Sequence, residues 1–325
     1  DLSGLKIFYF SFSATFTYMK RLLFYLLMFI GSNSNAQTII DVYFYEDSCF
    51  HEVIDPEMLF VERWDTLAQS KFWKTVINTT KDTCLINIAS NRKILNYIER
   101  SVWFNQTESE KNIFKDSVID YYCLDSNTRL YITAGKKEFY QIEQVIPSIE
   151  SAIKIFQENS VDPWFAQSIL LIESPAQLKY SSKGAYGPFQ IMKRVARNMG
   201  LIVNQYVDER KDFNKSAYAA SELLKRICIP QARRILCEMG DIEPFESELW
   251  FKFLVLHIYH AGAKNVESLL AQLDQPIQGM ELIKWMWTNE YGNFKNSSQN
   301  YSQIAIAAML TLKDIVVSDC NYIFD

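Results

Sequence analysis

The chain has 325 residues, of which 49% are hydrophobic and 22% charged, with a net charge of −5 and an isoelectric point of about 5.4. This composition is typical of a globular protein that buries a full core, in one large domain or two smaller ones. The acidic balance, and the lack of a basic block or a basic-aromatic patch in the sequence, argue against nucleic acid as a partner.

The N-terminal stretch has the pattern of an export signal. Two basic residues follow Met19, residues 22–30 are apolar, and small residues precede Gln37. This order is typical of a cleavable secretory signal peptide. We expect residues 1–18 to lie upstream of the native start and 19–36 to be the signal, which places the mature protein in the periplasm or cell envelope. An uncleaved anchor is the alternative, although a membrane span needs about 20 apolar residues.

An even number of cysteines follows the signal, which suits disulfides in an exported chain. They are Cys49, Cys84, Cys123, Cys228, Cys237 and Cys320. We expect a disulfide between Cys228 and Cys237, provided that Pro230 breaks the helix between them. There is no CxxC pair, and the sequence shows no further ligands around His257 and His260, so we expect neither a metal site nor a cofactor.

Residues 37–145 mix helix and strand patterns. Residues 38–47 and 129–135 are rich in β-branched and aromatic side chains, which predicts short strands. Residues 56–77 have the spacing of one amphipathic helix. No catalytic constellation is visible here. We expect a small α+β domain of unknown role that packs on its neighbour, with an envelope protein as its candidate partner.

From residue 146 onward the pattern is helical. The expected helices lie at 147–159, 162–174, 189–200, 214–227, 248–262 and 300–317. Asp162 has the position of an N-cap, with Pro163 at the first helical position. The stretch 248–262 is apolar nearly all round, which predicts a buried central helix. The predicted fold class is therefore α+β, with a mostly helical domain at 146–318 and a short tail at 319–325.

Glu173 stands at the end of an apolar helical stretch, directly after residues 169–172. Burial raises the pKa of a carboxyl group because the charged form loses hydration, and the negative end of a helix acts in the same direction. A carboxylic acid that is protonated near neutral pH can donate to a leaving oxygen, as glycoside cleavage requires. Gly184 and Gly187 permit a tight turn nearby, and Gln190 offers an amide to sugar groups.

Four motifs follow one another in the second half of the chain. The first spans residues 173–192 and comprises "ES" at 173–174, Ser181 (or Ser182), "GAYG" at 184–187 and "QIM" at 190–192. The other three are "VDERKD" at 207–212, "IYHAG" at 258–262 and "NYS" at 300–302. In this order they resemble the lytic transglycosylase family with a soluble-transglycosylase-type (SLT), goose-lysozyme-like domain, and most closely its membrane-bound D-type branch. The resemblance covers roughly residues 147–315 and implies a mostly α-helical, lysozyme-like catalytic domain.

The resemblance implies an enzyme that cleaves the β-1,4 bond between N-acetylmuramic acid and N-acetylglucosamine in peptidoglycan glycan strands, leaving a 1,6-anhydro end. Glu173 is then the single general acid and base. The implied substrate-binding residues are Ser174, Ser181, Gly187, Gln190, Met192, Tyr259, His260, Asn300 and Tyr301. For Tyr259 and Tyr301, packing in the core is the alternative role.

Two positions depart from the family pattern. His260 stands where the family has asparagine, and Ser297 stands where it has a glutamate proposed to orient the acid. These departures keep two other interpretations open: a hydrolase on the same fold, and a non-catalytic wall-binding or assembly protein. Because Glu173, Gln190 and Tyr259 are retained, we expect the transglycosylase.

Overall fold

The computed structural model describes residues 38–44, 48–173, 180–181 and 183–324. Residues from Thr38 onward form one compact unit. The predicted signal peptide and its upstream segment lie outside the described residues. In the described ranges, every helix is too short or too polar to span a membrane.

The described chain begins with a hairpin and short helices. Strand β1 (Ile39–Phe44) pairs antiparallel with β2 (Cys49–Ile54), and α2 (Glu57–Val61), a 3₁₀ turn η2 (Trp64–Thr66) and α3 (Ala68–Asn78) follow. The prediction of one helix over 56–77 is wrong. Arg63 has a left-handed backbone with φ of 65° and Leu67 is extended, so both interrupt the helical hydrogen bonds.

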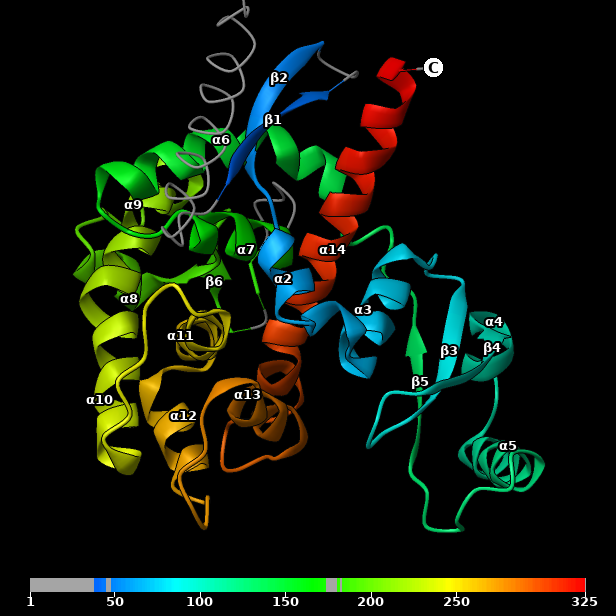
Figure 1. The fold of residues 1–325 in the computed structure, drawn as a ribbon. Helices are drawn as coiled ribbons and strands as arrows, with labels where there is room; N and C mark the ends of the chain where they lie inside the picture. The colour runs from blue at the N-terminus through cyan, green and yellow to red at the C-terminus, as the bar shows by residue number, and fades with distance from the viewer. Residues whose placement is uncertain (1–37, 45–47, 174–179, 182, 325) are drawn as a thin grey trace, which may run out of the picture. The chain divides into compact units, whose positions relative to one another are not determined.

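A three-stranded antiparallel sheet comes next. Its order is β4 (Ile94–Glu99), β3 (Thr83–Ile88), β5 (Leu130–Ala134), with α4 (Arg100–Phe104) and α5 (Glu108–Tyr121) between β4 and β5 in the sequence. The strands predicted at 38–47 and 129–135 are confirmed as β1 and β5. The sheet and α5 have a small core of their own, formed by Ile86, Ile88, Val118 and Leu130. Figure 1 shows α3 between this sheet and α14.

The rest of the chain is mostly helical. Its elements are α6 (Ile142–Glu158), α7 (Trp164–Glu173), the short hairpin β6 (Ala185–Tyr186) and β7 (Ile191–Met192), α8 (Lys193–Asn198), the 3₁₀ turn η3 (Glu209–Lys211), α9 (Phe213–Leu223), a π-helical segment η4 (Leu224–Cys228), α10 (Ile229–Gly240), α11 (Leu249–Ala261), α12 (Ala263–Leu270), α13 (Gly279–Thr288) and α14 (Asn296–Phe324). The predicted fold class, α+β, is confirmed.

Two predicted features of the helices are confirmed. The backbone N–H of Trp164 donates to Oδ1 of Asp162 at 2.9 Å, so Asp162 caps α7. Helix α11 is buried from Leu249 to Ile258 and ends at Gly262, whose φ is 83°. A glycine accepts this left-handed φ without strain, and this explains why the helix stops there.

Several predicted boundaries differ from those observed. Helix α6 begins five residues before Pro147, and α14 runs beyond the predicted 300–317 and includes most of the expected tail. The predicted helix at 189–200 is wrong in its first part, because residues 191–192 pair with β6 and only α8 is helical. The predicted domain limits at 145/146 and 318/319 fall inside α6 and α14.

One large core joins both halves of the sequence. It contains Trp64 and Phe72 from the first half and Phe156 and Phe253 from the second, and the rings of Trp64 and Phe253 lie 4.8 Å apart. Buried polar contacts add to it. Gln167 exchanges two hydrogen bonds of 2.8 Å with the backbone of Ile54 at the end of β2. The hairpin β1–β2, α2 and α3 therefore pack into the helical core.

The predicted disulfide between Cys228 and Cys237 is wrong. Both are free thiols, the first buried in η4 and the second exposed on α10. Helix α9, η4 and α10 follow without interruption, and nine residues of helix separate the two cysteines by about 13 Å, well beyond disulfide reach. Pro230 lies directly after the π-helical segment η4, in the first turn of α10, and the helix continues through it.

Candidate active site

Glu173 is the last residue of α7, and the four residues before it are buried. The hydroxyl of Tyr301 donates a hydrogen bond of 2.8 Å to its Oε1. Burial raises the pKa of Glu173 to about 7, while the hydrogen bond from Tyr301 acts in the opposite direction. At neutral pH the carboxyl group is therefore divided between its acidic and its ionised forms, as an acid–base catalyst requires.

Tyr301 is buried in the second turn of α14 and its ring stacks on His260, with centroids 4.3 Å apart and planes inclined by 25°. Burial, and next the charge of Glu173, raise the pKa of Tyr301 well above its usual value, so it remains a donor. Loss of hydration on the face that stacks against Tyr301, and then the charge of Lys183, lower the pKa of His260 to about 4, although the residue is otherwise exposed. A neutral imidazole thus supports the ring that holds the carboxyl group.

Tyr140, which the sequence did not single out, is also beside Glu173. It is buried just before α6, and burial and then the charge of Glu173 raise its pKa above the usual value. It comes from a stretch without a motif, 33 residues before the acid. Only the packing of α6 against α7 brings the two together, so no local pattern could have identified it.

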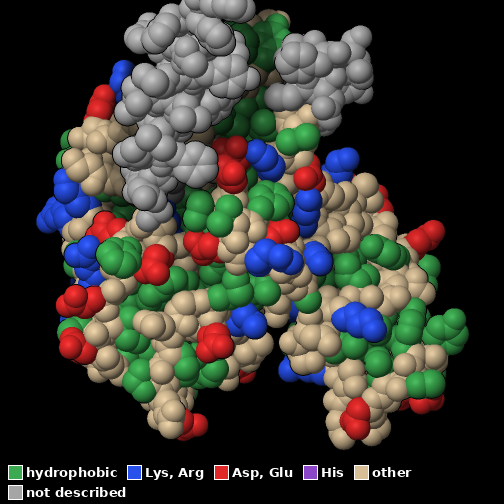
Figure 2. Space-filling model, viewed as in Figure 1, with side chains coloured by type: hydrophobic (Ala, Val, Ile, Leu, Met, Phe, Trp, Pro, Cys, Tyr) green, Lys and Arg blue, Asp and Glu red, His purple; other side chains and the backbone are tan. Residues whose placement is uncertain are grey.

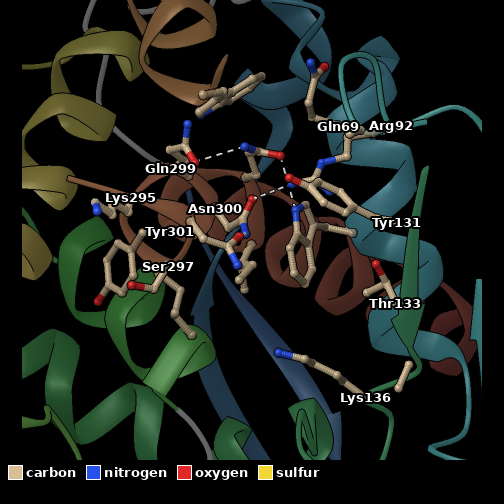
Figure 3. Close-up of a pocket in the computed structure, with 18 of the residues that line it drawn as sticks. Gln69, Arg92, Tyr131, Thr133, Lys136, Lys295, Ser297, Gln299, Asn300 and Tyr301 are labelled. Atoms are coloured by element: carbon tan, nitrogen blue, oxygen red, sulfur yellow. Dashed lines mark hydrogen bonds between the residues drawn. The ribbon is translucent and has the colours of Figure 1, made fainter. Parts of the chain in front are cut away.

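A cleft of about 1280 Å³ opens beside Glu173. Three of the predicted substrate-binding residues line it, namely His260, Asn300 and Tyr301. Figure 3 shows Ser297 and Tyr301 on one side, with Thr133 and Lys136 on the other. The first side belongs to α14 and the second to β5 and the loop after it. Figure 2 shows the surface hollowed between the sheet and the helices.

The sequence predicted that Gly187 contacts substrate. In the structure, Gly187 packs closely against the backbone of another segment. It lies in the loop of the β6–β7 hairpin with φ of 85°, and a Cβ there would lie 2.1 Å from the carbonyl oxygen of Arg210. The guanidinium of Arg210 donates to the carbonyls of Gly184 (3.1 Å) and Ile191 (3.0 Å) and pairs with Asp208 at 2.7 Å. The "VDERKD" segment therefore anchors the hairpin.

Gln190 and Tyr259 make bonds to the same hairpin loop. Gln190 has a left-handed backbone with φ of 45°, and its amide donates to the carbonyl of Gly187 at 3.0 Å. The hydroxyl of Tyr259 donates to the carbonyl of Phe189 at 2.7 Å. A left-handed glutamine stores backbone strain, which is typical of functional positions. Neither side chain is among those that line the cleft.

The remaining predicted contacts lie elsewhere. Ser181 accepts a hydrogen bond of 2.9 Å from the backbone N–H of Ala185, and the exposed Met192 precedes α8. Neither lines the cleft. Ser174 and the alternative serine, Ser182, lie outside the described residues. His260, Asn300 and Tyr301 therefore line the same cleft as Glu173. The predicted residues of the β6–β7 hairpin make contacts with one another.

Asn300 connects the two sides of the cleft. It is buried on α14, and its Oδ1 accepts a hydrogen bond of 3.1 Å from the guanidinium of Arg92, which follows β3. Its Nδ2 donates to Asn296 at 2.7 Å. Ser297, where the resembled family has glutamate, is exposed one turn before Tyr301 and lines the cleft.

His257 faces the interior beneath the site. Its Nε2 lies 2.8 Å from the hydroxyl of Ser302, which also accepts a hydrogen bond from Trp287. Burial and then the charge of His260 lower the pKa of His257 to about 3. In the part of the chain that the structure describes, no three histidine, cysteine or acidic side chains gather as a metal site would require.

Comparison with known proteins gives one finding. Residues 150–272 match the family model described as "Transglycosylase SLT domain". No curated protein and no solved structure matches the chain. The matched region contains Glu173, the β6–β7 hairpin with its Arg210 anchor, and His260, whereas Tyr140 and Tyr301 lie outside it. The match supports the assignment of this part of the chain to the lytic transglycosylase, lysozyme-like family.

Proposed function

We propose that the protein is a peptidoglycan lytic transglycosylase that cleaves the bond from N-acetylmuramic acid to N-acetylglucosamine, with Glu173 as its single acid–base catalyst. One observation carries the proposal: inside a region that matches the transglycosylase domain, a carboxyl group with a pKa of about 7 faces a cleft. Within the same family, we propose the D-type branch, on the strength of the "VDERKD" segment and the motif order.

In the first step, the protonated Glu173 donates to the glycosidic oxygen while the bond from that oxygen to the anomeric carbon of the muramoyl sugar breaks. Tyr301 holds Oε1, so we assign the transferred proton to Oε2. The hydrogen bond from Tyr301 also stabilises the carboxylate that forms. A pKa near the working pH suits this donation, because the acid is present and its proton leaves readily.

In the second step, the carboxylate of Glu173 takes the proton of the C6 hydroxyl in the same muramoyl sugar. The C6 oxygen bonds to the anomeric carbon, which forms the 1,6-anhydro ring and restores the protonated acid. An intramolecular nucleophile can correspond to an effective concentration of about 10⁵–10⁸ M, so no second carboxylate is needed to activate water. Hydrolases that act on glycosides commonly use such a pair.

We also propose export to the periplasm or cell envelope. Support comes from the order of basic, apolar and small residues over 19–36, and from the substrate, which lies outside the cytoplasmic membrane. N-terminal sequencing of the protein from its native envelope tests this. A mature start at or near Gln37 is expected, and an intact N-terminus upstream of Lys20 would make the segment an anchor.

The activity is tested by digestion of purified sacculi with the mature protein, followed by mass spectrometry of the soluble muropeptides. The expected products carry 1,6-anhydro-muramoyl ends, which are one water lighter than reducing ends. Reducing ends alone would identify a hydrolase. In that case Glu290, an acid that also lines the cleft, is the first candidate for activating water.

A second candidate function is a wall-binding protein without activity. The observation that favours it is the exposed Ser297 in the cleft, where the resembled family has an orienting glutamate. The substitution Ser297→Glu separates the two. If the missing carboxylate limits a weak enzyme, the variant releases more anhydro-muropeptide than the wild type. If the wild type binds sacculi and neither protein releases product, the binding function replaces the enzymatic one.

A further inference from the structure

The cleft carries an excess of positive charge on a protein whose net charge is −5. Among the described residues, its lining has five cationic side chains and two acids, Glu173 and Glu290. The cations are Arg92, Arg100, Arg129, Lys136 and Lys295. Four of them come from the sheet and the segments next to it, outside the region that matches the transglycosylase domain.

Aromatic rings hold these cations in place. The guanidinium groups of Arg92 and Arg129 lie 5.3 and 5.0 Å from the ring centre of Tyr131, and the ammonium group of Lys136 lies 5.6 Å from that of Trp73. In the described ranges none of the five cleft cations makes an ion pair with an acid. Such contacts orient a cation without neutralising it.

One cation of the sheet side, Lys136, is linked to a neighbour of the proposed catalytic acid. Lys136 is one turn before Tyr140, whose backbone N–H donates to the carbonyl of Lys136 at 3.0 Å. Tyr140 in turn lies near enough to Glu173 to feel its charge. Burial lowers the pKa values of Lys136 and Arg92, so each is a partly dehydrated cation, and among the described residues neither has an acidic counter-ion. An anionic ligand group would supply that counter-ion.

We propose that this side of the cleft binds carboxylate groups of the peptides attached to the glycan, so that the protein prefers peptide-bearing strands to bare ones. The inference rests on the proposed function. A glycan strand without peptides offers hydroxyl and acetamido groups and one lactyl carboxylate on each muramoyl sugar, whereas an attached peptide carries several carboxylates at a distance from the sugar. Lys136 and Arg129 are the side chains we assign to these carboxylates, since both line the cleft and neither has an acidic partner in the described ranges.

The test uses the mature chain with Glu173→Gln, which removes cleavage from a binding measurement. Two ligands are compared by calorimetry: soluble uncross-linked glycan strands with their peptides, and the same strands stripped by an amidase. The stripped strands keep one lactyl carboxylate on each muramoyl sugar, so the comparison isolates the carboxylates of the peptide. We expect peptide-bearing strands to bind about tenfold more tightly, with a preference that weakens as salt is added. Lys136→Gln and Arg129→Gln, in the same background, should each lower this ratio about threefold or more.

The neighbouring lysine provides a matched control. Lys137 is exposed and does not line the cleft, so Lys137→Gln should leave the ratio unchanged. Lys136→Arg keeps the charge and should keep the preference, which separates loss of charge from loss of folding. Thermal melting of each variant accompanies the binding measurements.

Equal binding of the two strand types overturns the inference, as does a preference that persists in the double variant Lys136→Gln, Arg129→Gln. Tighter binding of a phosphate-bearing wall polymer than of peptide-bearing strands overturns it as well. Cleavage of peptide-bearing strands by the wild type is scored separately. Its absence would remove the proposed activity, while the binding ratio would still decide the inference.

Discussion

The two sides of the cleft are built on different physical principles. On the helical side, Glu173, Tyr301 and His260 form a chain of contacts in which the acid is partly protonated and the imidazole neutral. On the sheet side, Lys136 and Arg129 lie over aromatic rings, and neither makes an ion pair with an acid in the described ranges. In the roles we propose, dehydration serves proton transfer on the first side, and fixed charge serves recognition on the second.

The two sides of the cleft also differ in the contacts that fix them in the fold. The hairpin and helices next to Glu173 are held by buried polar bonds, with Arg210 joining three carbonyl or carboxylate partners. The sheet has its own small core and joins α14 through contacts such as Arg92 to Asn300. Changes on the helical side should therefore affect chemistry and stability together, and changes on the sheet side should affect binding.

The largest expected effect is on the helical side. Glu173→Gln keeps the shape of the side chain but can neither donate an acidic proton nor accept one. General acid–base catalysis contributes typically ~10²–10⁴-fold, and one residue serves both steps here, so the release of anhydro-muropeptides should fall by about 10⁴-fold or more. Release is quantified by mass spectrometry, with melting to verify folding. A variant as active as the wild type would refute the assignment, and an equal loss in Glu290→Gln would indicate a second acid.

The next effect concerns stability. Arg210→Ala leaves Asp208 and two hairpin carbonyls without their partner in a buried site, and breaking such a pair typically costs about 3–5 kcal/mol. Lys136→Gln, on the other side, removes a cation–π contact and should cost about 1 kcal/mol or less. Urea denaturation measures both. Similar costs for the two variants would contradict the difference we describe between the two sides.

A third effect is a pH-dependent gain in stability. The pKa of Glu173 is raised in the folded state from 4.5 to about 7, so the folded protein binds more protons there than the unfolded one, and stability falls as pH rises between these values. Glu173→Gln removes this loss. It should be more stable than the wild type by about 1–3 kcal/mol at pH 8, with the difference shrinking toward pH 5. If the stability difference between the variant and the wild type grew as the pH fell, the direction assigned to the pKa shift of Glu173 would be wrong.

The smallest effect concerns Tyr301→Phe. This variant loses the hydrogen bond that favours the carboxylate, so the pKa of Glu173 should rise further, by about 1 unit or less. The alkaline limb of the profile of kcat/KM against pH should then move to higher pH. The rate itself should fall several-fold. A pH profile measured on soluble glycan strands shows this. A shift toward lower pH would mean that Tyr301 does not act as the donor.

The helical side was largely predictable from the sequence, because its signals are local. The apolar run before Glu173 and the all-apolar stretch of α11 gave the two helices, and short motifs pointed to the carboxyl group and to Tyr301. The predictions failed where the backbone at one residue departed from what the surrounding sequence pattern indicated. The left-handed Arg63 splits a helix that periodicity made continuous, and the regular helix through Pro230 separates two cysteines expected to meet.

The sheet side was not predictable, since it depends on residues distant in sequence. Tyr140 reaches Glu173 only through the packing of α6 on α7, and Arg92 meets Asn300 across more than 200 residues. No spacing rule connects such pairs. Their cationic character is also diluted in a chain whose net charge is negative, so composition pointed away from an anionic ligand.

The central claim is that Glu173 holds a proton near neutral pH, and its most direct test is a titration of that carboxyl group. Carbon-13 NMR of protein labelled at the glutamate side chains follows each carboxyl signal with pH, and the spectrum of Glu173→Gln identifies the signal of Glu173 by its absence. We expect a midpoint of about 7. A midpoint near the ordinary value of 4.5 would show a solvated carboxylate at the end of α7 and would contradict the account.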